Sequence, residues 1–255
     1  MKKYELTSET KVINGVELHR IKALNSFGNI NKGELGGWIE SEKNLSQEGN
    51  AWVYDNATVR GNAWVLDNAE VRGNATIRGN ATVLGNAMVF NDVKVYGNAT
   101  IRENACVYGH ARVGGHARIY GHSEVYGYSE VSGNARVGGN AAVEDNAKVG
   151  DNATVEENAW VRGNARICGN AKVSGNATVG GDATVFENAD YIVFKNWWSS
   201  GRYFTWTRSN NKWSVGCFYG SGEELIAKAY KDSEKSGREY ERVVKYVESI
   251  LKEEK

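Results

Sequence analysis

The strongest pattern in the chain is an aliphatic position that recurs every six residues. It begins at Val53 and ends at Val185, and all 23 of these positions hold Val or Ile. Two residues earlier in each hexapeptide stands Ala, except at Val93, Ser123 and Ser129. The positions that flank the aliphatic residue are mostly polar, so successive side chains point to opposite sides, as they do in a strand. Each hexapeptide therefore predicts one short strand with one buried side.

A Gly-Asn pair separates successive strands and predicts a turn, because both residues tolerate positive φ at low cost. Acidic residues replace the glycine at Asp55, Asp67, Glu103 and Glu187, so we assign the left-handed conformation to the Asn position. Short strands joined by identical turns have no hairpin partner, and must pair with strands of neighbouring coils. Residues 49–189 therefore predict a parallel solenoid.

These repeats resemble the hexapeptide-repeat family, in which an aliphatic residue is followed four positions later by a small one. The segments Val53 to Ala57 and Ile77 to Ala81 fit this motif. The resemblance implies a mainly β fold, namely a left-handed parallel β-helix with three faces and 18 residues per coil. With strands ~4.8 Å apart, roughly eight coils form a prism about 37 Å long.

The segment before the repeat, residues 1–48, predicts an N-terminal β cap. Its stretch KVINGVELHRI places Asn14-Gly15 between two β-branched runs. This dipeptide favours a hairpin with a type I′ turn. A cap is also expected on physical grounds, because an open stack of coils exposes unpaired strand edges.

The segment after the repeat, residues 190–255, predicts a C-terminal α+β domain. We expect two or three strands with a turn at 209–211, followed by two helices. Ser221 is expected to cap the first helix. The second helix, over 238–255, carries one apolar stripe, formed by Tyr240, Val243, Val244, Val247, Ile250 and Leu251.

Composition excludes several classes of protein. Lys and Arg together number 31, as do Asp and Glu, and a balanced charge argues against general nucleic-acid binding. Cys106, Cys168 and Cys217 are odd in number and widely spaced, which favours free thiols in a reducing compartment. The chain shows neither a signal peptide nor an apolar run of membrane-spanning length. We therefore expect a cytoplasmic protein without a membrane segment.

The most unusual stretch is GHARVGGHARIYGHSEVYGYSE, in which His110, His116 and His122 stand six residues apart. Residues six apart lie at different corners of one coil, separated by roughly four strand steps of ~3.3 Å each. Metal ligands must all lie within about 2.1 Å of one ion, so these histidines cannot share a metal within one subunit, and we predict no metal site. They are either turn residues that replace Asn or residues with a role at a subunit interface.

Residues 18 apart do touch in such a solenoid. His110 then lies between Asp92 and Tyr128 at one corner. Aromatic side chains occupy the outward position just before that corner on three successive coils, at Phe90, Tyr108 and Tyr126. These six residues form the first candidate ligand site. Three uses stay open: an oligomer interface, a ligand site, or catalysis by a histidine oriented by a carboxylate.

The tail carries a second candidate set, in which aromatic and arginine side chains alternate: Arg202, Trp206, Arg208 and Trp213. Such residues stack on bases and pair with phosphates, or pack as core against the two helices. The second face of the prism carries a basic stripe that would suit an anionic partner or a solvated surface: Arg60, Arg78, Lys94, Arg112, Lys148 and Arg166.

Three classes of function remain. Our leading hypothesis is a non-catalytic binding protein, because uninterrupted coils leave no loop to shape an acceptor pocket. The family resemblance implies a homotrimer. The segment around FGNINKGELGGWIES and the tail resemble uncharacterised hexapeptide proteins of phages and enteric bacteria, which implies a phage or prophage protein. Such a protein would capture a nucleotide-like signal or a host protein to counter host defence, without a cofactor.

The second class is an acyltransferase, an activity common among hexapeptide proteins. His110 would then act as general base, and acetyl-CoA would be the donor. The third is a rigid structural spacer.

Overall fold

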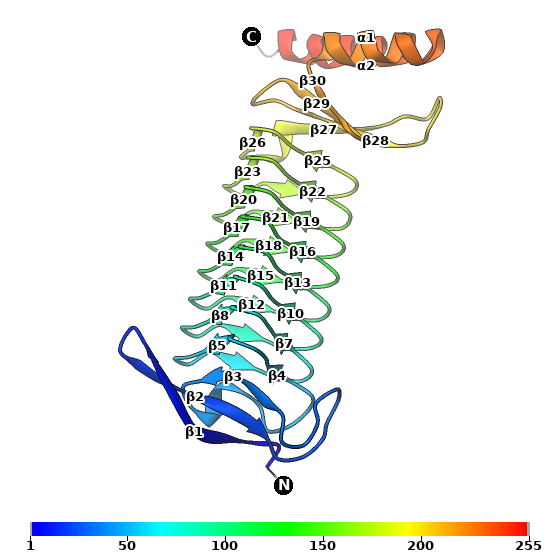
Figure 1. Cartoon of the computed structure of the whole chain (residues 1–255). Helices are drawn as coiled ribbons and strands as arrows, with labels where there is room; N and C mark the ends of the chain where they lie inside the picture. Colours follow the sequence, from blue (N-terminus) through cyan, green and yellow to red (C-terminus); the bar gives the residue numbers. More distant parts are fainter. Residues whose placement is uncertain (1, 254–255) are drawn as a thin grey trace.

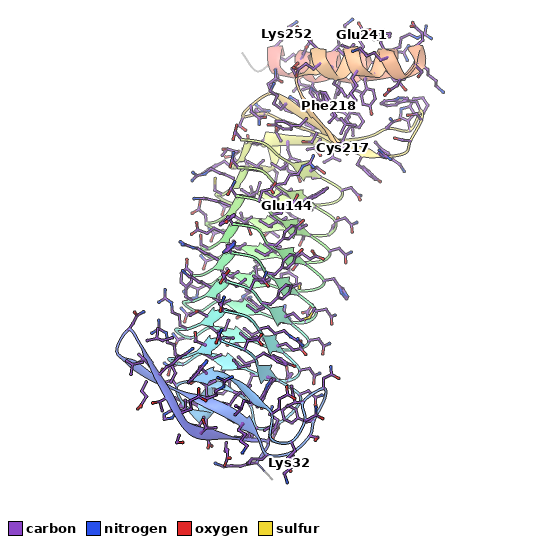
Figure 2. All side chains as sticks on the ribbon, in the orientation of Figure 1. Lys32, Glu144, Cys217, Phe218, Glu241 and Lys252 are labelled. Carbon is purple, nitrogen blue, oxygen red and sulfur yellow. The ribbon has the colours of Figure 1, made fainter. Side chains whose placement is uncertain are left out.

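The chain folds into a parallel β-solenoid with a cap at each end, as the computed structural model shows for residues 2–253 (Figure 1). The hexapeptides form two-residue strands, and partners on adjacent coils lie 18 residues apart, as Val89 and Val107 do. The predicted solenoid with 18-residue coils is thus confirmed. Figure 2 shows the side chains that project outward along its length.

Three parallel sheets form the sides of the solenoid. The first sheet contains β4 (Trp52–Val53), β7 (Glu70–Val71), β10 (Met88–Val89), β13 (Cys106–Val107), β16 (Glu124–Val125), β19 (Ala142–Val143), β22 (Trp160–Val161) and β25 (Thr178–Val179). The second contains β5 (Thr58–Val59), β8 (Thr76–Ile77), β11 (Lys94–Val95), β14 (Arg112–Val113), β17 (Glu130–Val131), β20 (Lys148–Val149), β23 (Arg166–Ile167) and β26 (Thr184–Val185). The third contains β6 (Trp64–Val65), β9 (Thr82–Val83), β12 (Thr100–Ile101), β15 (Arg118–Ile119), β18 (Arg136–Val137), β21 (Thr154–Val155) and β24 (Lys172–Val173).

The core of the solenoid consists of the aliphatic and small positions of the repeat. All 23 Val or Ile positions are fully buried, and each contributes about 1.5–3 kcal/mol by leaving water. Ser123 and Ser129 take small positions and are also buried. The Ser123 hydroxyl donates to the carbonyl of Tyr120 (2.8 Å), whereas the Ser129 hydroxyl has no hydrogen-bond partner among the described residues.

The left-handed residue of the turns is the one before Asn, and our assignment to the Asn position is wrong; only Glu187, after the last solenoid strand, is extended at this position, with a φ of -134°. Gly61 has φ of 69°, and the acidic replacements Asp55, Asp67 and Glu103 have φ of 52°, 58° and 64°. The Asn side chains instead form ladders along the corners, in which Asn68 Nδ2 donates to Asn86 Oδ1 (3.0 Å). Asn is therefore used for contacts between coils and not for its tolerance of positive φ.

The acidic residues at the glycine position are held by a second contact between coils. The carboxylate of Asp67 accepts a hydrogen bond from the amide of Gly85 (3.0 Å), and Glu103 accepts one from Gly121 (2.8 Å). Further acidic residues repeat the contact: Asp55, Asp145, Asp151 and Glu157. This charge-assisted bond offsets the cost of the left-handed conformation, which is about 1–2 kcal/mol for a residue with a Cβ.

The N-terminal cap is built on the predicted hairpin. It comprises β1 (Tyr4–Ile13), β2 (Val16–Ala23), β3 (Leu35–Ile39) and the short 3-10 helix η1 (Glu42–Asn44). Asn14 and Gly15 both have positive φ, at 52° and 78°, as a type I′ turn requires. β3 pairs antiparallel with β2 and parallel with β5, so the cap continues the second sheet.

The C-terminal domain is a four-stranded sheet covered by two helices. After the 3-10 helix η2 (Asn188–Asp190) come the strands β27 (Tyr191–Lys195), β28 (Tyr203–Thr207), β29 (Lys212–Val215) and β30 (Phe218–Gly220), then α1 (Gly222–Asp232) and α2 (Glu234–Glu253). The fourth strand was not expected from the sequence. The Ser221 hydroxyl accepts from the Glu224 amide (3.2 Å), which confirms the predicted cap. Residues 254 and 255, expected at the end of the second helix, lie outside the described residues.

This sheet lies between the last coil and the helices. Tyr191 and Val193 pack against the solenoid core, whereas Phe204 and Trp206 pack in a second core with α1 and α2. Figure 1 shows the resulting order of solenoid, sheet and helices. The alternation of a strand therefore places one set of side chains on each neighbour.

The two ends of the solenoid differ chemically, because each backbone amide donates to a carbonyl on the following coil, as Thr58 does to Ala75 (2.8 Å). The N-terminal end leaves carbonyl oxygens, and donors cap them: Lys3 Nζ reaches Ala51 and Asn44 Nδ2 reaches Gly61 and Ala63. The C-terminal end leaves N–H groups, and acceptors cap them: Asn188 Oδ1, Thr205 Oγ1 and Ser209 Oγ accept from Lys172, Thr178 and Thr184. Both caps thus satisfy groups that would otherwise be open edges.

Candidate functional site

The three clustered histidines belong to three separate corners. His116 Nε2 lies 3.4 Å from the side-chain amide of Asn98, and His122 Nε2 lies 3.5 Å from that of Asn104. Both histidines therefore continue an Asn ladder. His110 differs, because the two adjacent coils place Asp92 and Tyr128 at its corner, and neither is Asn.

The His110 corner is a ladder of ionisable and aromatic groups. His110 Nδ1 lies 3.5 Å from Asp92 Oδ2, and Asp92 Oδ1 accepts from the Asn74 amide (3.0 Å). On the other side, the imidazole stacks on the Tyr128 ring with centroids 4.7 Å apart and planes 10° apart. The side chains of His110 and Asp92 are about half exposed, at 49% and 47%. Even a fully charged contact so exposed contributes at most about 1 kcal/mol, so this one orients the imidazole more than it stabilises the fold.

The predicted aromatic column is a continuous stack on the first sheet. Phe90 and Tyr108 have centroids 5.0 Å apart, and Tyr108 and Tyr126 have centroids 4.8 Å apart, with nearly parallel planes. The Tyr108 hydroxyl donates to Glu124 (2.9 Å), and that of Tyr126 donates to Glu144, which is labelled in Figure 2. Partial burial and these carboxylates raise the pKa of both phenols, which therefore stay protonated and serve as donors.

The structure separates the first candidate set into two surfaces. Asp92, His110 and Tyr128 line a shallow groove of about 450 Å³ that opens toward the second sheet. We call it the corner groove; the other residues that line it are Asn74, Lys94, Arg112, Glu130 and Lys148. Phe90, Tyr108 and Tyr126 do not line it, because they stand before the corner and face outward from the first sheet.

Sequence reasoning named Lys94 and Arg112 as part of the basic stripe but did not place them beside His110. Lys94 and Arg112 are register partners on β11 and β14, and each stands two residues after a residue of the corner ladder. Neither forms an ion pair with any residue of the described chain, whereas Lys148 lies 3.8 Å from Glu130. The sequence spacing could have shown this proximity, because Asp92 and Lys94 lie two residues apart on one coil. His110 and Arg112 lie two residues apart on the next coil. The structure therefore joins the corner to the basic stripe.

The tail candidates lie in different environments. Trp206 and Trp213 are register partners and only 1% exposed, because β28 and β29 turn these rings toward the helices. They are core residues and offer no ring face to a ligand. Arg208 is half-buried, and its amide donates to Asp190 (2.8 Å). Arg202 lies apart from both tryptophans, on the wall of a cavity beneath the helices.

Two negative findings concern the described residues. Residues 2–253 contain no group of three or more His, Cys, Asp or Glu side chains arranged to hold a metal ion. Within the same residues, neither helix combines the length and the apolar character needed to cross a membrane.

The solenoid of this chain is similar to known proteins. A family model described as the YdcK β-solenoid repeat matches residues 165–181. A protein of Escherichia coli (strain K12), described as the uncharacterized acetyltransferase YdcK, is 36% identical over 67 residues, which are 23% of this chain and 21% of that protein. The match thus spans about a fifth of the relative's length. Together with the 18-residue coils, these similarities identify the repeat of this chain as a hexapeptide β-solenoid repeat.

Proposed function

We propose that the protein is a non-catalytic binding protein that holds a small, nucleotide-like anion in the corner groove. The observation that carries this proposal is the position of the Lys94 and Arg112 pair beside the stacked rings of His110 and Tyr128. The cations supply charge for phosphate, and the rings supply an aromatic edge for a base.

The charge of the groove favours an anion. Asp92 lies next to His110, and Glu130 next to Lys148, so each acidic group has a partner. Lys94 and Arg112 form no ion pair among the described residues, although they sit side by side on neighbouring strands about 4.8 Å apart; Glu130 is the strand partner of Arg112 on its other side. A bound phosphate would relieve this repulsion and accept bidentate hydrogen bonds from the arginine.

Calorimetric titration with AMP, ADP and cyclic nucleotides tests the proposal, with adenosine and inorganic phosphate as separate components. We expect the double variant Lys94→Gln/Arg112→Gln to lose at least tenfold in affinity. The matched control is Arg118→Gln/Arg136→Gln, which removes a register-paired arginine couple from the third sheet. Equal loss in both variants would mean that only the overall charge matters, and no binding by the unmodified protein would reject the site.

We further propose that the protein is a homotrimer in which the first sheet is the contact surface. That sheet exposes Met88 (42%) and Trp160 (37%) beside the aromatic column, and exposed aromatic stripes favour association. Sedimentation of the protein at the mass of a monomer would contradict the proposed homotrimer. We propose that, in a phage, such a trimer counters host defence by binding a signal nucleotide of the host. Binding alone would lower the free concentration of that signal.

A second candidate function is acetyl transfer, favoured by the similarity to a protein described as an acetyltransferase and by the carboxylate beside His110. His110 would take a proton from the acceptor amine as it attacks the thioester of acetyl-CoA. Release of free CoA in the presence of amines, abolished by His110→Ala, would establish this function. If the protein neither releases CoA nor binds a nucleotide, the remaining function is that of a structural spacer.

A further inference from the structure

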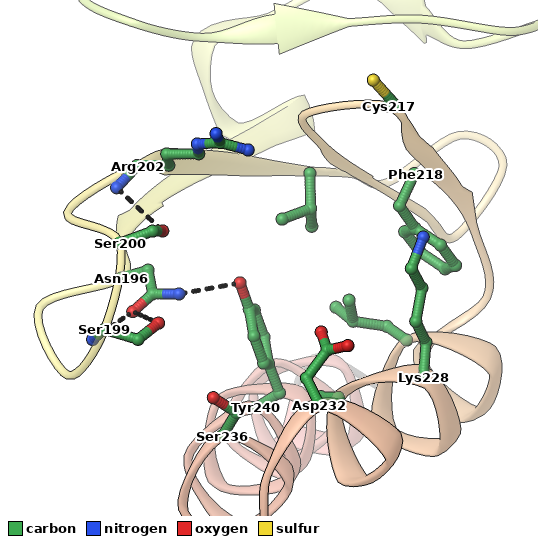
Figure 3. Close-up of a pocket in the computed structure, with 13 residues that line it drawn as sticks. Asn196, Ser199, Ser200, Arg202, Cys217, Phe218, Lys228, Asp232, Ser236 and Tyr240 are labelled. Carbon is green, nitrogen blue, oxygen red and sulfur yellow. Dashed lines mark hydrogen bonds between the residues drawn. The ribbon is translucent and has the colours of Figure 1, made fainter.

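A second cavity lies in the C-terminal domain, far along the chain from the corner groove. It has a volume of about 310 Å³ and lies between the four-stranded sheet and the helices α1 and α2 (Figure 3). We call it the terminal pocket. Polar groups come from the loop before β28 and from the helices, and apolar groups come from the strands and α1.

The pocket contains the hydroxyl group of Tyr240, which has unused hydrogen-bonding capacity. Tyr240 is only 7% exposed, and its hydroxyl accepts from Asn196 Nδ2 (3.1 Å). No residue of the described chain accepts the Tyr240 proton, and Figure 3 shows the hydroxyl directed into the pocket. Ser236, 8% exposed as a residue, also lines the pocket. Buried donors normally have partners, so the Tyr240 hydroxyl points to a missing acceptor.

Arg202 supplies positive charge across the pocket. In Figure 3 it lies on the sheet side, opposite the helices that carry Tyr240 and Asp232. Its guanidinium forms no ion pair and no hydrogen bond with another described side chain. Burial raises the pKa of Tyr240, and Arg202 and Asp232 act on it in opposite directions, so both charges are felt at the hydroxyl.

The rest of the lining is apolar. Val215 and Phe218 contribute from the sheet, and Leu225 and Ala229 contribute from α1. Lys228 lies at the rim with Nζ 5.5 Å from the centre of the Phe218 ring. The pocket therefore combines polar groups, which include both Arg202 and Asp232, with one apolar wall, and its volume lies at the lower end of the usual size range of ligand sites, about 300–1,000 Å³.

We propose that the terminal pocket binds a small organic carboxylate with an apolar body. The carboxylate accepts from the Arg202 guanidinium and the Tyr240 hydroxyl, and the body lies against Val215, Phe218 and Leu225. Asp232 disfavours a second negative group at the helix side, so the pocket selects monocarboxylates over dicarboxylates.

Titration of the full chain with 3-phenylpropionate tests this site, with heat as one readout and alkylation of Cys217 as another. Cys217 lines the pocket and is exposed, so a bound ligand should slow its modification, as followed by mass spectrometry of the peptide. We expect Arg202→Gln and Tyr240→Phe each to weaken binding about tenfold or more. Arg238→Gln removes an exposed cation from the same helix pair and should bind like the unmodified protein.

Several results would overturn the proposal. They are no binding and no protection of Cys217 at millimolar 3-phenylpropionate, equal affinity for the uncharged 3-phenylpropanol, and equal affinity in Arg202→Gln and Arg238→Gln. Lys94→Gln/Arg112→Gln should bind 3-phenylpropionate normally, so failure of the corner groove and failure of the terminal pocket are distinguishable.

Discussion

The ring of Tyr96 lies flat against Gly114, in the space that a side chain at Gly114 would need. An added Cβ would overlap with the Tyr96 ring atoms Cε2 and Cζ. The guanidinium of Arg78 lies 5.3 Å from the centre of the same ring. The third sheet repeats the arrangement with Arg102, Tyr120 and Gly138. These glycines are needed because an aromatic ring from the preceding coil covers them, and neither has a positive φ.

Gly114→Ala should therefore displace the Tyr96 ring and weaken its contact with Arg78. Gly150 is the matched control, because it occupies the same position two coils later and its Cβ would meet only Ser132 Oγ, at 3.8 Å. Gly150→Ala should stabilise by about 0.4–1 kcal/mol, since alanine restricts the unfolded chain. Gly114→Ala should be less stable than Gly150→Ala by about 1–2 kcal/mol. Urea midpoints measure the difference, and equal midpoints would contradict the packing argument.

Ser129→Ala should stabilise the solenoid. The Ser129 hydroxyl is buried without a partner among the described residues, and an unsatisfied buried hydroxyl costs about 1–3 kcal/mol. Ser123→Ala is the control, because Ser123 donates to Tyr120 and should lose stability or stay unchanged. Thermal melting of both variants tests the pair, and a lower midpoint for Ser129→Ala would show that its hydroxyl is satisfied in solution.

Variants of Asp67 separate two contributions to stability, that of its hydrogen bond to the next coil and that of its left-handed backbone conformation. Asp67→Ala keeps a Cβ at a φ of 58° and removes the acceptor of the Gly85 amide, so it should lose the contribution of a hydrogen bond to a charged group, about 1–2 kcal/mol. Asp67→Gly removes the same acceptor and relieves the backbone, so it should cost much less. Denaturant unfolding compares the two, and equal losses would mean that the backbone conformation carries little strain.

Tyr54 should titrate late in alkaline solution. Partial burial and the neighbouring Glu70 raise its pKa from 10.0 to about 12, and its hydroxyl donates to Glu70 (3.3 Å). Because the folded pKa lies above the unfolded one, this group's contribution to stability is complete below pH 10 and is lost as the pH rises to about 12. Glu70→Gln should move the Tyr54 transition toward pH 10. Absorbance of tyrosinate at 295 nm, with Tyr54→Phe to assign the transition, measures the shift.

The fold was predictable because the repeat is local in sequence and regular in space. The Val and Ala positions determine the strands, and the 18-residue register placed Asp92, His110 and Tyr128 together correctly. The left-handed position was wrong for a physical reason. Acidic residues appeared unsuited to positive φ, and the amide of the next coil that stabilises them is not visible in one hexapeptide.

The remaining features depend on contacts that no local pattern encodes. The register showed which residues are stacked, but a corner turns the chain, so Tyr108 faces away from the groove while Arg112 faces into it. Similarly, the alternation along β28 offered packing of one set of side chains on the helices, but only the assembled domain shows that the other set covers the last coil, where Thr205 Oγ1 accepts from the Thr178 amide.

The single direction of the inter-coil hydrogen bonds also determines how copies of this chain could join. Bare N–H groups at one end of a stack match bare carbonyl oxygens at the opposite end of another, so uncapped copies would add head to tail. Such a contact does not close on itself and builds an open filament. These end groups are hydrogen-bonded instead to Lys3 and Asn44 at one end, and to Asn188, Thr205 and Ser209 at the other. Each copy is thereby kept as a rod of finite length.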